Sequence, residues 1–232
     1  MEQYLEKTKL LDYGHPSIQK LVSARSWKCR DDFGKIKEIY SYVRDEILFG
    51  YNANDAIPAS GVLAAGFGQC NTKGTLFMAL LRAVGIPCRV HGFMIDKKLQ
   101  KGAMTGIVYR LAPQRVFHSW VEVFFEGEWY ELEGFILDRA YLTALQQKFC
   151  DCTSAFCGYG VAVKNFQNPT IDWKRNNTYI QSEGIVADLG IYPSPDALLK
   201  EHGQELPPLK AFAYTHFGRH QMNRNVSRIR RG

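Results

Sequence analysis

The sequence lacks the features that mark a membrane-spanning or exported chain. Its 232 residues contain no run of eighteen or more apolar residues, so we expect no transmembrane helix. The first segment, MEQYLEKTKLLDYGHPS, is charged and has no apolar stretch of the kind that a signal peptide carries. We therefore expect a cytoplasmic protein that does not contact membranes, with its six cysteines mostly reduced.

Patterns that would hold a metal ion or a nucleotide are also missing. Cys150, Cys152 and Cys157 are spaced C-x-C-x4-C, which lacks the second pair of ligands that a zinc site needs. His216 and His220 are four residues apart, but no glutamate stands where a zinc protease needs one. No glycine-rich phosphate loop is present, so the sequence predicts neither a metal nor another cofactor.

Excess positive charge is modest and lies mainly at one end. The chain has 29 Lys and Arg against 23 Asp and Glu, a net charge of +6. From residue 203 onward, six positive and one negative side chains account for +5 of it: Lys210, Arg219, Arg224, Arg228, Arg230 and Arg231 against Glu205. We expect this segment to be a solvated or self-docking helix or tail rather than a nucleic-acid contact.

The residues that are present suit one globular domain. Apolar residues make up 46% of the chain and aromatic residues 13%, enough for one sizeable core. We expect residues 1–135 to hold N-terminal helices and a mixed α+β core. Residues 136–232 are expected to form a C-terminal extension, mostly helical and basic at its end, that packs on the core as part of one domain.

Helices are predicted where apolar residues recur at helical spacing and capping residues stand at the ends. These segments are 32–47, 60–66, 70–84, 139–149, 195–202 and much of 209–230. The expected N-caps are Asp31 or Asp32, Ser60, Asp138 and Ser194.

Strands are predicted at 88–95 and in a hairpin over 115–135, where Val, Phe, Trp and Tyr are dense. Residues 96–113, with three lysines, two glycines and a proline, are expected to be a surface loop with at most one helical turn, and a lid over a cleft is a further hypothesis. No clear element is predicted between 150 and 193.

The hairpin brings an imidazole and a carboxylate together without any long-range assumption. If Glu126 and Gly127 form the turn, residue numbers that face each other sum to 253. His118 then faces position 135, and Glu133 lies diagonal to it on the same face. Glu131 shares that face and is the alternative partner.

Cys70 stands at the first turn of a predicted helix. The free N–H groups and the positive dipole end found there favour a thiolate over a thiol. An imidazole beside the sulfur would form a thiolate–imidazolium pair, and a carboxylate behind the imidazole would fix its tautomer. Cys70, His118 and Glu133 are therefore candidate members of one nucleophilic site.

Two longer segments carry a family resemblance. GQCNTKGTLFMALLRAVGIPCRVHGF and FHSWVEVFFEGEWYELEG resemble the transglutaminase-like superfamily over about residues 35–135. Members have a cysteine at the start of a helix that ends in Arg-x-x-Gly-Ile-Pro-x-Arg, then a His-x-Trp-x-Glu strand. A second tryptophan and an acidic third residue follow. The acidic residue is usually aspartate, whereas Glu133 stands there in this chain.

The resemblance implies a papain-like α+β fold with the nucleophile helix packed on an antiparallel sheet. It also implies attack of the thiolate on a peptide or protein amide, with an acyl-enzyme intermediate. We favour hydrolysis over protein-glutamine amine transfer, because the sequence has no acidic calcium loop and no flanking β domains. A non-catalytic binding module that keeps the fold is the other alternative.

The resemblance leaves the remaining site residues less defined. The backbone N–H of Cys70 is the expected oxyanion donor, with Gln69 and Tyr51 as candidates for a second donor. Trp120 is expected either to pack near the site or to contact substrate. Neither the substrate nor the oligomeric state is predicted.

Overall fold

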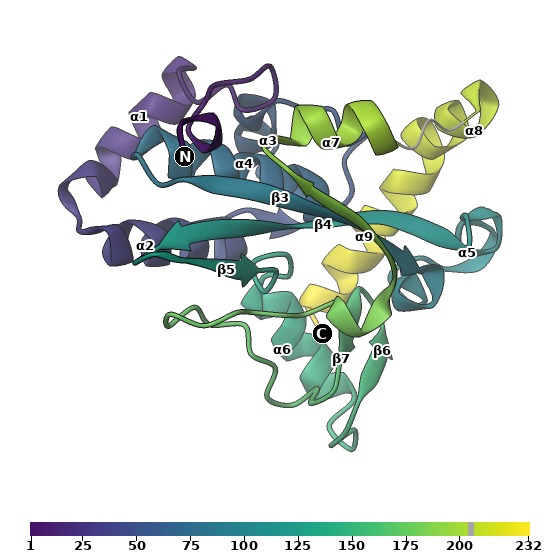
Figure 1. Ribbon diagram of the computed structural model, residues 1–232. Coiled ribbons are helices and arrows are strands. Elements are labelled where there is room, and N and C mark those ends of the chain that lie inside the picture. The colour runs from purple at the N-terminus through teal and green to yellow at the C-terminus, as the bar shows by residue number, and fades with distance from the viewer. Residues whose placement is uncertain (204–206) are drawn as a thin grey trace.

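A four-stranded antiparallel sheet organises the chain (Figure 1). The computed structural model describes residues 1–203 and 207–232. Along the sheet the order is β5–β4–β3–β8, formed by β3 (Cys88–Asp96), β4 (Arg115–Phe125), β5 (Glu128–Leu132) and β8 (Ile185–Tyr192). Shorter strands form two pairs outside this sheet: β1 (Leu48–Phe49) with β2 (Phe67–Gly68), and β6 (Phe156–Gly158) with β7 (Val161–Val163).

The β4–β5 hairpin has the predicted register. Phe125 pairs with Glu128 and Val121 pairs with Leu132, so facing residue numbers sum to 253 as expected. Glu126 and Gly127 both have positive φ, at 50° and 92°, which is the turn geometry that matches the twist of a two-residue hairpin. The register prediction is confirmed from Phe125 back to Val121, but the ladder ends at Leu132, so the predicted pairing of His118 with position 135 is wrong.

The helix that begins at Cys70 packs against this sheet. Helix α4 (Cys70–Ala83) buries its side chains from Asn71 through Arg82, and Gly74 faces Val121 of β4. It ends where predicted, with Gly85 at φ 83° just before Ile86 and Pro87. The predicted α+β core, with this helix on an antiparallel sheet, is confirmed.

Further helices precede α4. They are α1 (Pro16–Ala24), α2 (Asp32–Asp45) and α3 (Ala59–Ala65), with 3₁₀ turns at Glu2–Tyr4 and Trp27–Cys29. Asp31 caps α2 as one of the two predicted N-caps, accepting from the Gly34 N–H at 2.9 Å. The predicted Ser60 cap is wrong. Helix α3 begins after Pro58, and the Ser60 hydroxyl donates instead to the Asp12 carboxylate.

The 96–113 segment is more deeply anchored than a surface loop. It contains a 3₁₀ turn (Lys97–Gln100) and helix α5 (Gly106–Leu111). Leu99 and Ala103 are fully buried, which contradicts the expectation of an exposed loop for the first half of the segment. Leu99 packs with Ile95 and Ala162, so a small apolar cluster fixes it.

Strand β8 lies in the stretch for which the sequence predicted no element. It pairs with β3, but the register shifts at Gly92/Phe93 and again at Met94/Ile95. Its sequence, IVADLGIY, places apolar side chains on both faces, and Val186 and Ile191 remain exposed. The usual apolar/polar alternation of a strand is therefore absent from the sequence.

The C-terminal part adds α6 (Arg139–Lys148), a 3₁₀ turn (Ser182–Gly184), α7 (Pro195–His202), α8 (Pro208–Ala213), a π-helical turn (Tyr214–Gly218) and α9 (Arg219–Arg230). Residues 204–206, which fall within the predicted C-terminal extension, lie outside the described residues. Helix α9 crosses the molecule and brings the C-terminus to α6 (Figure 1). Within the two described ranges, no helix has both the length and the apolarity needed to cross a bilayer.

Asp138 connects three parts of this architecture. Its carboxylate caps α6 by accepting from the Tyr141 N–H at 3.0 Å and accepts from the Phe49 N–H at 2.9 Å. It also forms an ion pair with Arg230 of α9 at 2.7 Å. Burial would raise the pKa of Asp138, but the bonds from Arg230 and the two N–H groups outweigh it and hold the pKa below 3.8.

We predict that Asp138→Ala lowers the free energy of unfolding by about 3 kcal/mol, because Arg230 loses its partner in a mostly buried pair. The depressed pKa means that this stabilisation is present above pH 3.8 and is lost as the pH falls through the folded-state pKa. Urea unfolding at pH 7 measures the difference. Glu183→Ala, which breaks an exposed pair with Lys164, is the control and should change little. Equal effects of the two variants would contradict the prediction.

Candidate active site

Cys70 is the first residue of α4 and is partly exposed. The Gln69 carbonyl before it accepts the Lys73 N–H at 2.8 Å, which closes the first helical turn. At this position in a helix the backbone N–H has no intrahelical acceptor. The cysteine therefore presents a sulfur and an N–H at the same helix end.

His118 and Glu133 are in direct contact. His118 lies in β4, Glu133 follows the last residue of β5, and both are fully buried. The imidazole Nε2 and a Glu133 carboxylate oxygen are 2.7 Å apart. The contact predicted from the hairpin register is thus present.

Two backbone N–H groups hold the other oxygen of the carboxylate. Ile180 donates to Glu133 Oε2 at 2.7 Å and Gln181 donates at 2.8 Å. The Glu133 N–H in turn donates to the Thr178 carbonyl at 2.9 Å. One carboxylate oxygen therefore faces His118, and the other is fixed by the segment that leads into β8.

The second imidazole nitrogen of His118 is left for Cys70. Nδ1 is buried and has no partner of standard hydrogen-bond geometry among the described residues. Burial lowers the pKa of His118, but the neighbouring Cys70, by its negative charge and by hydrogen bonding, raises it more, and Glu133 adds to this. The pKa of His118 is raised from 6.5 to about 10. The site thus favours a protonated imidazole between a sulfur and a carboxylate.

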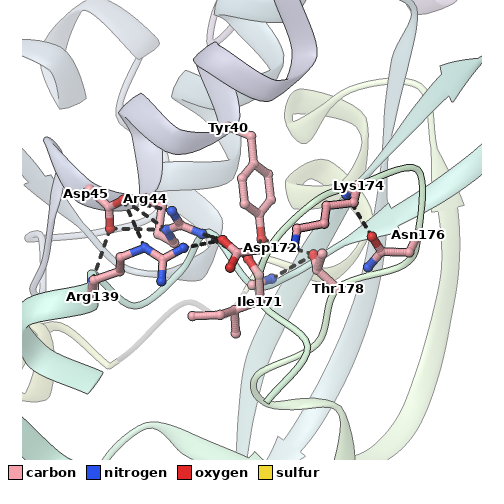
Figure 2. Close-up of polar contacts among 10 residues, drawn as sticks. Tyr40, Arg44, Asp45, Arg139, Ile171, Asp172, Lys174, Asn176 and Thr178 are labelled. Atoms are coloured by element: carbon pink, nitrogen blue, oxygen red, sulfur yellow. Dashed lines mark hydrogen bonds and ion pairs between the residues drawn. The ribbon is translucent and has the colours of Figure 1, made fainter. Parts of the chain in front are cut away.

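A polar network beneath Glu133 fixes the segment that holds it. The Tyr40 hydroxyl, from α2, donates to the Ile171 carbonyl at 2.7 Å and lies 3.1 Å from Thr178 Oγ1 (Figure 2). Thr178 Oγ1 accepts from the Gly134 N–H at 3.2 Å. A side chain of α2 is thus connected through Thr178 to the backbone on both sides of the carboxylate.

Arginines reinforce the same loop. Arg44 donates to the Ile171 carbonyl at 3.0 Å and to Asp172 at 2.8 Å, and Arg139 of α6 forms an ion pair with the same aspartate (Figure 2). Arg44 also pairs with its neighbour Asp45 at 2.9 Å. Helices α2 and α6, whose arginines are about 95 residues apart in the sequence, therefore hold the loop around Asp172 in one position.

The loop before α3 fixes the start of the nucleophile helix. The Asn52 N–H donates to Gln69 Oε1 at 2.8 Å, and Asn52 Oδ1 accepts from the Thr72 hydroxyl at 2.6 Å. Gln69 Nε2 donates to Asp55 at 2.9 Å. Gly68 is required here, because a Cβ at this position would lie 2.5 Å from Thr72 Oγ1. Both polar atoms of Gln69 are thus engaged with the loop.

Two tyrosines lie near the thiol. Burial raises the pKa of Tyr51 and of Tyr214, and the negative charge of Cys70 raises both further. The Tyr51 hydroxyl donates to Gln100 Oε1 at 2.7 Å, and the Tyr214 hydroxyl donates to the Asn52 carbonyl at 3.1 Å. A C-terminal residue, which the sequence did not indicate, therefore reaches the surroundings of the cysteine.

The other predicted residues occupy defined places. Trp120 shares a face of β4 with His118 and packs on Phe93 at a ring distance of 4.1 Å, and its buried Nε1 has no hydrogen-bond partner among the residues described. Glu131, the alternative partner of His118, accepts instead from the Tyr179 hydroxyl. All six cysteines lie in the described ranges and are free.

Sequence reasoning missed Asn52, Asp55, Thr178 and Tyr214. The polar turn FGYNANDAIP is dense in hydrogen-bonding residues, and that density was the available signal for the first two. Thr178 and Tyr214 lie in segments with no regular pattern, so nothing local connected them to the site.

Comparison with known proteins shows which family part of the chain resembles. Residues 20–134, about half of the chain, match the transglutaminase-like superfamily. Uncharacterized protein YebA of Bacillus subtilis (strain 168) is 28% identical over 110 residues, which are 44% of this chain and 15% of YebA. The chain thus spans a small part of that curated relative.

Solved structures are similar at lower identity. A candidate cysteine protease from Cytophaga hutchinsonii is 14% identical with a TM-score of 0.48, covering 83% of this chain and 47% of its own. Red sea bream transglutaminase is 18% identical with a TM-score of 0.32, covering 57% and 26%. A candidate protease from Parabacteroides distasonis ATCC 8503 is 14% identical with a TM-score of 0.36, covering 72% and 31%.

We predict that Glu133→Asp slows alkylation of Cys70 by iodoacetamide at pH 7 by about 10- to 100-fold. An aspartate is one methylene shorter, so it cannot reach His118 while keeping the bonds from Ile180 and Gln181. Peptide mass spectrometry after timed labelling gives the rate. Glu131→Asp shortens a carboxylate that contacts Tyr179 and should leave the rate within about twofold. A Glu133→Asp rate equal to that of the unaltered protein would contradict this geometry.

Proposed function

We propose that this chain, whose residues 20–134 form a domain of the transglutaminase-like superfamily, is a cysteine enzyme that hydrolyses amide or peptide bonds through an acyl-enzyme. The observation that carries the proposal is the continuous arrangement of three groups. A sulfur at an open helix end lies next to a buried imidazole, and a carboxylate fixed by two N–H groups contacts that imidazole.

In the acylation step, the Cys70 thiolate attacks the carbonyl carbon of the amide and a carbon–sulfur bond forms. The oxyanion that develops accepts from the Cys70 backbone N–H, which the helix leaves without a partner. His118 Nδ1 gives its proton to the leaving nitrogen, the carbon–nitrogen bond breaks, and a thioester remains. Glu133 keeps the imidazole oriented and stabilises its positive charge throughout.

In the deacylation step, water attacks the thioester carbon while His118 takes a proton from it. The carbon–sulfur bond breaks and the carboxylic acid product leaves, which restores the thiolate–imidazolium pair. An amine could replace water and give a new amide, so cross-linking is the alternative outcome at the same site. Trp120 Nε1, with its donor unused, is a candidate contact for the acyl part of the substrate.

A non-catalytic binding module would not need this charge arrangement. Keeping an imidazole and a carboxylate fully buried is costly unless the two are paired. Here the pair is made and one imidazole nitrogen remains directed to a sulfur. That retention favours catalysis over binding alone.

We predict that alkylation of Cys70 is nearly constant from pH 6 to pH 9. Because the pKa of His118 is raised to about 10, the imidazole stays protonated across this range and keeps a positive charge beside the sulfur. In His118→Ala the rate should instead fall about tenfold per pH unit below about 8, as for an ordinary thiol that titrates near about 8.5. Cys29, which is exposed, is the internal reference in the same molecule. A wild-type profile that follows Cys29 would contradict the ion pair.

The proposed reaction is tested by incubating a library of glutamine-containing peptides with the protein, with and without a primary amine, and analysing products by mass spectrometry. We expect cleaved or deamidated peptides in both cases, and no product with Cys70→Ala. Products that contain the added amine would mean that the enzyme transfers the acyl group to amines instead of hydrolysing the acyl-enzyme. If Cys70 is still labelled but no peptide product forms, the non-catalytic binding module is favoured.

A further inference from the structure

A narrow pocket lies between α4, the sheet and α7. Its polar lining consists of Asp55, Asn71, Thr75 and Ser119, and apolar residues such as Val90 and Leu198 complete it. We call this site the acceptor pocket, after its hydrogen-bond acceptors. It has room for about one water-sized group. Asn71 directly follows Cys70 in α4, so the pocket lies near the start of the nucleophile helix.

The hydrogen-bond donors of this pocket are already used. The Ser119 hydroxyl donates to Asn71 Oδ1 at 2.8 Å, and the Thr75 hydroxyl donates to the Asn71 carbonyl at 3.0 Å. The Asp55 carboxylate accepts a hydrogen bond from the Asn71 amide and a second one from Gln69 Nε2 at 2.9 Å. What the pocket still offers is oxygen lone pairs: two from hydroxyls, more from a carboxylate. A ligand with donors and no acceptors suits it.

Asp55 differs from the buried carboxylates elsewhere in the chain. Glu122 pairs with Arg89 and His91, and Asp138 pairs with Arg230. Within residues 1–203 and 207–232, no cation lies within ion-pair distance of Asp55, and both of its donors are neutral amides. The residue is partly buried, and burial raises the pKa of its carboxyl group.

The carboxylate is also close to the chemistry. Asp55 hydrogen-bonds the residues on both sides of Cys70 in the sequence, Gln69 and Asn71. Its negative charge and that of Cys70 both raise the pKa of the Tyr214 hydroxyl. A cation bound at Asp55 would therefore lie close to the start of the helix that carries Cys70.

We propose that the acceptor pocket binds a primary ammonium group of the substrate and makes Asp55 a specificity residue for a lysine-like side chain next to the reacting amide. An ammonium group has three hydrogen-bond donors and no acceptor, and it is about the size of a water molecule. A guanidinium group is too large for the space. This inference rests on the proposed function, because it names part of the substrate of the same site.

The first test uses two methanethiosulfonates of matched size, one with a 2-aminoethyl group and one with a propyl group. The thiolate attacks the sulfenyl sulfur, a mixed disulfide forms and methanesulfinate leaves, so no turnover is needed. We expect the ratio of cationic to neutral rate to be about tenfold higher at Cys70 than at exposed Cys29. Equal ratios at the two cysteines would overturn the proposal, and this comparison needs no variant.

Asp55→Asn then removes the charge while keeping the shape and the bond from Gln69. We expect the ratio of the two rates at Cys70 to fall to that at Cys29. Asp151→Asn, which removes a charge from an exposed loop, is the matched control and should leave the ratio unchanged. A ratio that survives Asp55→Asn would assign the effect to another group and overturn the proposal.

The second test compares peptides that carry lysine, arginine or norleucine beside the reacting amide. We expect lysine to lower KM about tenfold relative to norleucine in the unaltered protein and not in Asp55→Asn. If cadaverine instead becomes the preferred acyl acceptor in an Asp55-dependent way, the ammonium belongs to the acceptor and the side-chain assignment is overturned. If no peptide reacts but the methanethiosulfonate rate ratio is still higher at Cys70 than at Cys29, the proposed hydrolysis is wrong and the ammonium site is still supported.

Discussion

The hydrogen bond between His118 and Glu133 is the contact on which the rest of this site depends. Both groups are fully buried, and burying charge is unfavourable unless each charged atom has a partner. The structure meets that condition for both carboxylate oxygens and for the imidazole Nε2. Ile180 and Gln181 bind the far oxygen of the carboxylate, His118 binds the near one, and Cys70 is left for the remaining nitrogen. Removing any one partner would leave a buried charge unsatisfied.

This requirement explains why distant segments converge below the sheet. The segment that supplies two N–H groups to Glu133 has little regular structure, so its own hydrogen bonds cannot fix it. Tyr40 and Arg44 of α2 and Arg139 of α6 hold it through Ile171, Asp172 and Thr178 (Figure 2). On the opposite side of the thiol, Asn52 holds the start of α4, and Tyr214 from the C-terminal part holds Asn52. The site is therefore built by the whole chain, beyond the segment that matches the family.

The sequence could predict the parts of the site that depend on local rules. The turn at Glu126 and Gly127 sets the hairpin register, and that register places His118 and Glu133 near each other. The helix from Cys70 follows from apolar spacing and its Gly-Ile-Pro ending. The partners of these residues could not be predicted, because Tyr40 and Thr178 meet only after the chain has folded, 138 residues apart. Strand β8 was hidden for another reason: both of its faces carry apolar side chains, and its pairing shifts twice.

The replacement of aspartate by glutamate fits the same constraint. The extra methylene extends the Glu133 carboxylate, so one oxygen reaches the imidazole while the other reaches the N–H groups of the segment before β8. Because the longer side chain has one more rotatable bond, it needs this second anchor to hold one orientation. The acid of the site and the segment 178–181 are therefore one structural unit. Its position is fixed by the network around Tyr40, and only then does His118 present Nδ1 to the sulfur.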